Sequence, residues 1–187
     1  MDVIPNEEEQ MVKNLAREFL EAECPPILAR NMEKDEKGYP PELWQKMAGL
    51  GWLGMGLDEQ YGGQGLPLTY LGLILEEVGR TIAPVPLLST VVPSLTIAQN
   101  GTSEQRQQLL PRISRGELIL TWAMQEQDPR LLPETVHLEA RAQGDGYLLS
   151  GTKMFVDNFV VAEKFLVAAR TAPAGEQNQG VSLFLVD

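Results

Sequence analysis

The hydrophobic pattern of this 187-residue chain changes near Gly116, and that change constrains the fold more than any other feature. Upstream, apolar residues recur at the three- and four-residue spacing of amphipathic helices. Downstream, short runs of β-branched and aromatic residues alternate with turn-forming segments, which is typical of strands. The sequence therefore predicts an α+β fold, with an N-terminal all-α helical bundle domain over residues 1–116. A partial antiparallel β-barrel or β-sandwich domain follows over residues 117–187.

Capping residues and prolines mark the helix boundaries of the first domain. Asn6 followed by Glu9, and Thr102 followed by Gln105, have the spacing of capping boxes. Pro111 is expected to end or kink the last helix, because proline lacks the backbone N–H that continues it. The predicted helices cover residues 6–23, 41–50, 68–82, 87–99 and 103–110.

Two adjacent glutamates, Glu76 and Glu77, lie in the predicted helix over residues 68–82. That helix is apolar almost all the way round, so we expect other helices to enclose it. Neighbouring helical positions point in different directions, which argues against paired-carboxylate chemistry. We interpret the two glutamates as part of a solvated helix face.

The second domain is organised around a predicted hairpin at Gly144-Asp145-Gly146, where glycines favour a tight turn between residues 136–142 and 147–156. Further strands are expected over 118–124, 165–170 and 181–186, with residues 172–180 forming a long hairpin loop. If the hairpin strand runs to residue 156, alternation places Lys153, Phe155 and Asp157 on one face. We also expect another element to cover the open edge of the last strand.

Composition excludes several classes of function. The formal net charge of −11 and the pI of about 4.6 disfavour binding to nucleic acid and to anionic membrane surfaces. A local pocket for a phosphorylated ligand is still compatible with this net charge. No apolar run approaches the roughly 18 residues that span a bilayer. The single Cys24 and the absence of a secretory-type start predict a cytoplasmic protein. His137 has no ligand cluster around it, so no metal site is expected.

Several motifs in a fixed order carry a family resemblance: Glu59-Gln60-Tyr61-Gly62-Gly63-Gln64-Gly65, then Gly101-Thr102-Ser103-Glu104-Gln105, then Leu110-Pro111-Arg112-Ile113 with Gly116-Glu117, and finally Gly146-Tyr147 with Gly151-Thr152-Lys153. With these motifs the chain resembles the acyl-CoA dehydrogenases over essentially its whole length. The resemblance implies an oxidoreductase that uses FAD to oxidise the Cα–Cβ bond of an acyl-CoA thioester. It also implies a homo- or hetero-oligomer with another acyl-CoA dehydrogenase chain, and an electron-transfer partner.

The family's third domain, a C-terminal helical domain that usually supplies the catalytic glutamate, has no counterpart in this sequence. The reaction needs a base and the flavin on opposite sides of the substrate. No catalytic residue is therefore assigned, and these 187 residues are not expected to catalyse alone.

The resemblance places the flavin-binding candidates on two segments. Trp122, Met124 and Gln125 precede the loop where the family has Thr-Glu-Pro-x-Ala-Gly-Ser-Asp, and a plain strand-to-loop transition is the alternative reading. Here the loop reads Gln125-Glu126-Gln127-Asp128-Pro129-Arg130-Leu131-Leu132, so the family's small residues are replaced. Leu131, at one of those positions, is the substrate-binding candidate.

The second flavin-binding segment is Phe155-Val156-Asp157, where the family has an aromatic residue, a branched residue and a threonine or serine. An ionised aspartate near the flavin N5 would repel the charge of reduced flavin. The alternative is that Asp157 caps the strand or pairs with Lys153. Two functional hypotheses follow: an FAD-dependent acyl-CoA dehydrogenase, or a non-catalytic dehydrogenase-like subunit of a heteromeric complex with a degenerate flavin site.

Overall fold

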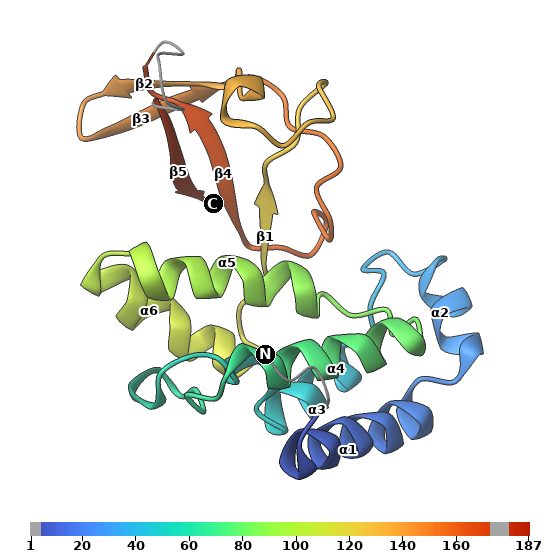
Figure 1. The fold of residues 1–187 in the computed structure, drawn as a ribbon. Helices are drawn as coiled ribbons and strands as arrows, with labels where there is room; N and C mark the ends of the chain where they lie inside the picture. The colour runs from blue at the N-terminus through green and yellow to red at the C-terminus, as the bar shows by residue number, and fades with distance from the viewer. Residues whose placement is uncertain (1–4, 173–179) are drawn as a thin grey trace. The chain divides into compact units, whose positions relative to one another are not determined.

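A computed structural model describes residues 5–172 and 180–187 of the chain (Figure 1). The chain forms two compact units, Met1–Ile119 and Leu120–Asp187. Helices make up the first unit and a five-stranded sheet the second, so the α+β class is confirmed. Most of the long loop expected over residues 172–180 lies outside the described residues.

The expected helices of the first unit are present, and both capping boxes form as the sequence predicted. The last helix continues through Pro111 instead of ending before it. Leu110 and Ile113, on either side of the proline, are both fully buried, and their packing outweighs one lost backbone hydrogen bond. The helices are α1 Glu7–Glu23, α2 Pro26–Met32, α3 Pro41–Gly49, α4 Leu68–Arg80, α5 Leu87–Asn100 and α6 Ser103–Ser114, with single turns η1 Trp52–Gly54 and η2 Glu59–Tyr61.

Large apolar side chains from α1, α3, α4, α5, α6 and the turn η1 are buried in the helical unit. Phe19 of α1 contacts Trp52 edge to face, with ring centroids 5.2 Å apart. Trp44 of α3 is buried, and its indole N–H donates to the carbonyl of Gly116 at 3.0 Å. The core also contains the fully buried Leu20, Met47, Leu53, Leu57, Ile74, Leu87 and Leu110.

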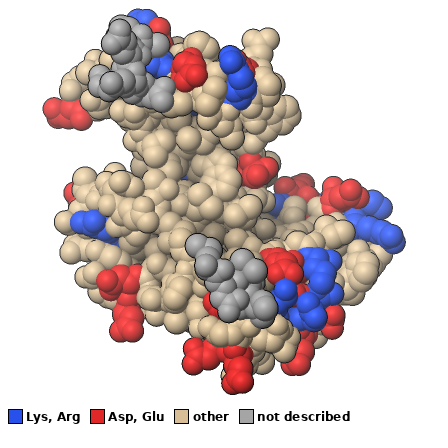
Figure 2. Space-filling view, in the orientation of Figure 1, with Lys and Arg blue, Asp and Glu red and all other residues tan. Residues whose placement is uncertain are grey.

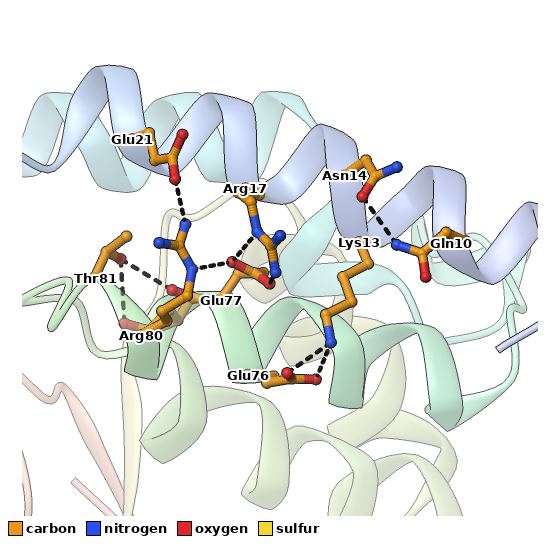
Figure 3. Close-up of polar contacts among 10 residues, drawn as sticks. Gln10, Lys13, Asn14, Arg17, Glu21, Glu76, Glu77, Arg80 and Thr81 are labelled. Carbon is orange, nitrogen blue, oxygen red and sulfur yellow. Dashed lines mark hydrogen bonds and ion pairs between the residues drawn. The ribbon is translucent and has the colours of Figure 1, made fainter. Parts of the chain in front are cut away.

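The two glutamates of α4 have opposite environments, which corrects the expectation of a solvated face for both. The Glu76 side chain is 57% exposed and pairs with Lys13. The Glu77 side chain is fully buried, and its carboxylate accepts hydrogen bonds from Arg17 of α1 at 2.7 Å and from Arg80 at 2.5 Å. Figure 3 shows the two guanidinium groups approaching Glu77 from different sides. The hydrogen bond from Arg17 lowers the pKa of Glu77 to about 2, against the opposing effect of burial.

The strands of the second unit form a mixed sheet in the order β1-β4-β2-β3, with β5 on the other edge of β4. Two pairs, β2/β3 and β4/β5, are antiparallel as expected, but β1/β4 and β2/β4 are parallel. The register pairs Thr121 with Phe165, and Arg141 with Leu148 across the expected hairpin. The strands are β1 Leu120–Ala123, β2 Glu139–Gln143, β3 Gly146–Ser150, β4 Lys164–Arg170 and β5 Val181–Val186.

The hairpin strand is shorter than the sequence predicted, because it ends at Ser150 and not at residue 156. Gly151, at a φ of +151°, packs so close to Leu138 that an added Cβ would lie 2.9 Å from the Leu138 Cα. Phe155 and Asn158 then both take φ values of +53°, which strands do not use. The face shared by Lys153, Phe155 and Asp157 was therefore a wrong prediction.

Within residues 5–172 and 180–187, no helix is long and apolar enough to cross a membrane. Most of the face drawn in Figure 2 is uncharged, and acidic and basic side chains lie on it in scattered groups. Surface ion pairs such as Lys46–Glu23 and Arg115–Glu117 bring opposite charges together. The excess of acidic residues in the chain is thus partly neutralised locally.

Replacing Glu77 by glutamine is expected to lower the free energy of unfolding by about 2 kcal/mol at pH 7, because a buried acceptor of two charge-assisted bonds is lost. The folded-state pKa of Glu77 lies below its usual 4.5, so this stabilisation is complete above pH 4.5 and disappears as the pH falls toward 2. Urea unfolding followed by circular dichroism at pH 7 and pH 2.5 measures both effects. Glu76→Gln, at the neighbouring exposed ion pair, is the control and should cost under about 0.5 kcal/mol.

Candidate functional site

A buried carboxylate, Glu126, organises the region that the sequence singled out after β1. It accepts backbone N–H bonds from His137 and Leu138, both at 2.9 Å, and a 2.8 Å ion pair from the Lys153 ammonium group. The side chains of Glu126 and Lys153 are only 9% and 6% exposed. Lys153 therefore pairs with Glu126, and the alternative of a Lys153–Asp157 pair is not formed.

The surroundings of the Glu126 carboxylate favour its ionised form. Burial alone raises the pKa of Glu126, but the hydrogen bond from Lys153 and those from the amides of Leu138 and His137 bring that pKa below its usual value. The ammonium group of Lys153 also donates to the carbonyl oxygen of Met124 at 3.1 Å. Glu126 is thus an ionised anchor at neutral pH.

Three segments meet at Glu126 and enclose a cavity of about 850 Å³ in the β unit. One further bond, from the amide of Met154 to the carbonyl of Gln125 at 2.8 Å, ties the segment after β1 to the segment after β3. The cavity is lined by Glu126, Gln127, Asp128, Pro129, His137, Leu138, Gly151, Thr152 and Met154. Its shape therefore depends on the Glu126–Lys153 pair.

The loop over residues 127–135 is closed by contacts within itself. The Asp128 carboxylate accepts the Arg130 amide at 3.0 Å and the Arg130 guanidinium at 2.6 Å, and these bonds lower the pKa of Asp128 to about 2. The hydroxyl of Thr135 donates toward the carbonyls of Arg130 and Leu132, at 2.7 and 2.8 Å. Arg170 of β4 holds the end of the loop by donating to the carbonyl of Val136 at 2.7 Å.

These contacts decide whether the loop fits the diphosphate of FAD, which needs converging backbone N–H donors and small residues. Pro129 and Pro133 have no N–H, and the amide of Arg130 is already bonded to Asp128. The amide of Thr135 is bonded to Leu132, which leaves the amides of Gln127, Asp128, Leu131, Leu132 and Glu134 for a ligand, but the bulky side chains of Arg130 and Leu131 stand where small residues are needed. A carboxylate, Asp128, also faces the cavity and would repel phosphate. The loop therefore does not fit the diphosphate group.

The predicted site residues fall into two groups. Met124 and Gln125 lie beside the segment that carries Phe155, joined through the bonds at Lys153 and Met154, and the Met124 and Phe155 side chains are 39% and 77% exposed. The remaining candidates are not grouped with them: Trp122 is half-buried in β1, Val156 packs against the core of the β unit, Asp157 is exposed in a turn, and Leu131 is 71% exposed in the closed loop.

The sequence interpretation missed the importance of three residues. Glu126 and Lys153 were recognised only as remnants of motifs, and Thr135 was not singled out. Their contacts join positions 27 residues apart in one case and five in another, so no local pattern reveals them. The signal available in the sequence was that Glu126 and Lys153 each lie in a motif that is otherwise apolar or rich in turn residues. A charged residue buried in such a motif is expected to have a partner. Within the described residues no cluster of metal-ligating side chains is present.

Comparison with known proteins identifies the family to which the chain belongs. The model for the acyl-CoA dehydrogenase N-terminal domain matches residues 6–117, and the chain therefore belongs to the acyl-CoA dehydrogenase family. A 3-(aryl)acrylate reductase of Clostridium sporogenes is 32% identical over 97% of this chain and 48% of its own length. The human mitochondrial short-chain specific acyl-CoA dehydrogenase is 34% identical over 96% of this chain and 44% of its own.

Solved structures agree with the sequence matches. The Tcur3481-Tcur3483 steroid ACAD G363A variant superposes with a TM-score of 0.86 at 40% identity, covering 97% of this chain and 48% of that one. The ChsE4-ChsE5 complex from Mycobacterium tuberculosis gives 0.85 at 30% identity, covering 100% and 48%. The chain thus spans about half the length of the relatives it matches.

Replacing Glu126 by glutamine is expected to destabilise the β unit by about 3 kcal/mol, because Lys153 would stay buried without a counter-ion. The double variant Glu126→Gln/Lys153→Met should recover part of that loss, since it removes both charges. Thermal and urea unfolding of the three proteins test this. Glu139→Gln, at an exposed pair with Arg141 on the same unit, should cost under about 0.5 kcal/mol. Equal losses in the exposed and buried variants would contradict the account.

Proposed function

We propose that the chain is the N-terminal part of a subunit in a heteromeric acyl-CoA dehydrogenase complex, and that its own flavin loop is degenerate. The closed Asp128–Arg130 loop carries this proposal, because it engages the Arg130 amide, presents a carboxylate and lacks the small residues that a diphosphate requires. In this role the chain supplies a folded scaffold to the complex. A second acyl-CoA dehydrogenase chain holds the FAD.

Similarity to complexes supports the choice of partner. Two of the similar structures are named for pairs of components, Tcur3481-Tcur3483 and ChsE4-ChsE5. The first is described as a steroid ACAD, so a steroid acyl-CoA thioester is the first substrate to test on the complex. The structure of an electron transferring flavoprotein of Acidaminococcus fermentans is also similar, with a TM-score of 0.76, and this favours a flavoprotein as electron acceptor.

A second candidate function is that of an FAD-dependent acyl-CoA dehydrogenase in its own right, desaturating an acyl-CoA thioester. The observation in its favour is the intact Glu126–Lys153 anchor, which holds Met124 and Gln125 beside the segment that carries the exposed Phe155. When bound, FAD would accept the hydride from the β carbon. An apolar side chain and an aromatic ring are suited to contact a flat cofactor ring.

The flavin content of the full-length protein separates the two candidates. Purified alone, the protein should carry well under one FAD per chain by visible absorbance, and FAD should be found in its complex with a second acyl-CoA dehydrogenase chain. The triple variant Asp128→Gly/Arg130→Gly/Leu131→Ser should raise FAD retention, because it opens the loop and restores small residues. The matched control is Leu148→Ser at an exposed leucine of β3. Stoichiometric FAD on the wild-type protein alone would contradict the first proposal.

The second candidate makes its own prediction at Asp157. If the flavin N5 lies beside this residue, Asp157→Thr should strengthen FAD retention, because a hydroxyl donor replaces a repelling carboxylate. Equilibrium dialysis of FAD with the full-length protein measures the change. Unchanged retention removes any N5 role for position 157 and with it the second candidate's main prediction.

A further inference from the structure

The cavity beside Glu126 lies wholly within the β unit, because each residue that lines it comes from that unit. Its volume of about 850 Å³ is within the roughly 300–1,000 Å³ that is usual for sites of drug-sized ligands. The loop on one side of the cavity does not fit a diphosphate. The lining itself therefore indicates which class of ligand the cavity can hold.

The charged groups of this lining already have partners. The Asp128 carboxylate accepts bonds from the amide, the Nε and a terminal nitrogen of Arg130. The Glu126 carboxylate accepts bonds from two amides and from Lys153. Among the described residues, no lysine or arginine lines the cavity. An anionic ligand would therefore meet two carboxylates and no counter-ion, and a cationic ligand would find both carboxylates engaged, so the lining favours a neutral ligand.

Three other side chains of the lining carry hydrogen-bonding groups that are open to a ligand. They are the amide of Gln127, the imidazole of His137 and the hydroxyl of Thr152. Within residues 5–172 and 180–187, none of these three side chains forms a hydrogen bond. An amide, a neutral imidazole and a hydroxyl can each donate and accept. They therefore suit a ligand that carries a hydroxyl or keto group.

The remaining side chains of the lining are apolar. Pro129, Leu138 and Met154 supply this part of the surface, and Met154 is 39% exposed. The flexible thioether of methionine adapts to ligands of irregular shape. A mainly apolar surface with a few polar groups is the usual composition of a small-molecule site.

We propose that this cavity binds a neutral, mainly apolar ligand of steroid-like bulk that carries a hydroxyl or keto group. The inference rests on the proposed function, because a loop that held the diphosphate would give this space to FAD. In the proposed complex the ligand is the acyl part of the thioester. The CoA part, which carries the phosphates, lies outside the cavity.

Equilibrium dialysis of the full-length protein with radiolabelled pregnenolone and pregnenolone sulfate tests the neutral class of ligand. The two probes share one ring system, but the sulfate carries a negative charge. Pregnenolone should bind at least about tenfold more tightly, because the sulfate would approach Asp128 and Glu126. The FAD content of the same samples, from their visible absorbance, reports separately on the proposed function.

Two variants place the binding at this cavity. Met154→Glu adds a carboxylate to the lining and should weaken pregnenolone binding by about tenfold or more. Thr152→Val removes one hydroxyl with little change of shape and should weaken it by about threefold to tenfold. The matched controls are Met11→Glu and Thr171→Val, at exposed positions outside the lining, and both should bind like the wild type. Urea unfolding of each variant identifies any loss of binding that comes from unfolding.

The outcomes separate the inference from the proposed function. No retention of pregnenolone, equal affinity for the sulfate, or wild-type binding by a folded Met154→Glu protein would each overturn the inference and leave the proposed function standing. Stoichiometric FAD on the protein alone would overturn both. Preferential binding of pregnenolone that only the cavity variants weaken would support the assigned site.

Discussion

The β unit depends on one buried interaction, the ion pair between Glu126 and Lys153. The two backbone amides and the ammonium group that surround the Glu126 carboxylate belong to segments far apart in the sequence. Satisfying a buried charge so completely fixes the relative positions of those segments, because an ion left without partners would cost several kcal/mol. The cavity beside Glu126 takes its shape from the same contacts.

The loop over residues 127–135, next to this ion pair, is held by contacts within itself. Its carboxylate, Asp128, is engaged by Arg130 of the same loop, and prolines remove further amide donors on both sides. An intact scaffold therefore lies beside a loop that no longer suits a diphosphate. This combination fits a family member that keeps the fold while a partner subunit supplies the cofactor, which is the function proposed above.

Local physical signals in the sequence were enough to predict the α-helices other than α2, the hairpin turn and the α+β class. The capping boxes at Asn6 and Thr102 form because their partners lie three residues away, within the reach of a sequence pattern. Features that depend on distant partners were missed. Glu77 is buried because Arg17, 60 residues earlier, neutralises it, and the hairpin strand ends early because Gly151 packs on Leu138. The grouping of the candidate site residues could not be predicted for the same reason, because their neighbours come from three separate segments.

Hydrogen–deuterium exchange on the full-length protein, with and without added FAD, tests the central claim that the loop over residues 127–135 does not bind the diphosphate of FAD. The measurement follows the amides of residues 127–132, of which that of Arg130 is bonded to Asp128. The account predicts that their protection is the same in both conditions. A clear rise in protection across these amides when FAD is added would show that the loop binds the cofactor, and would contradict the account.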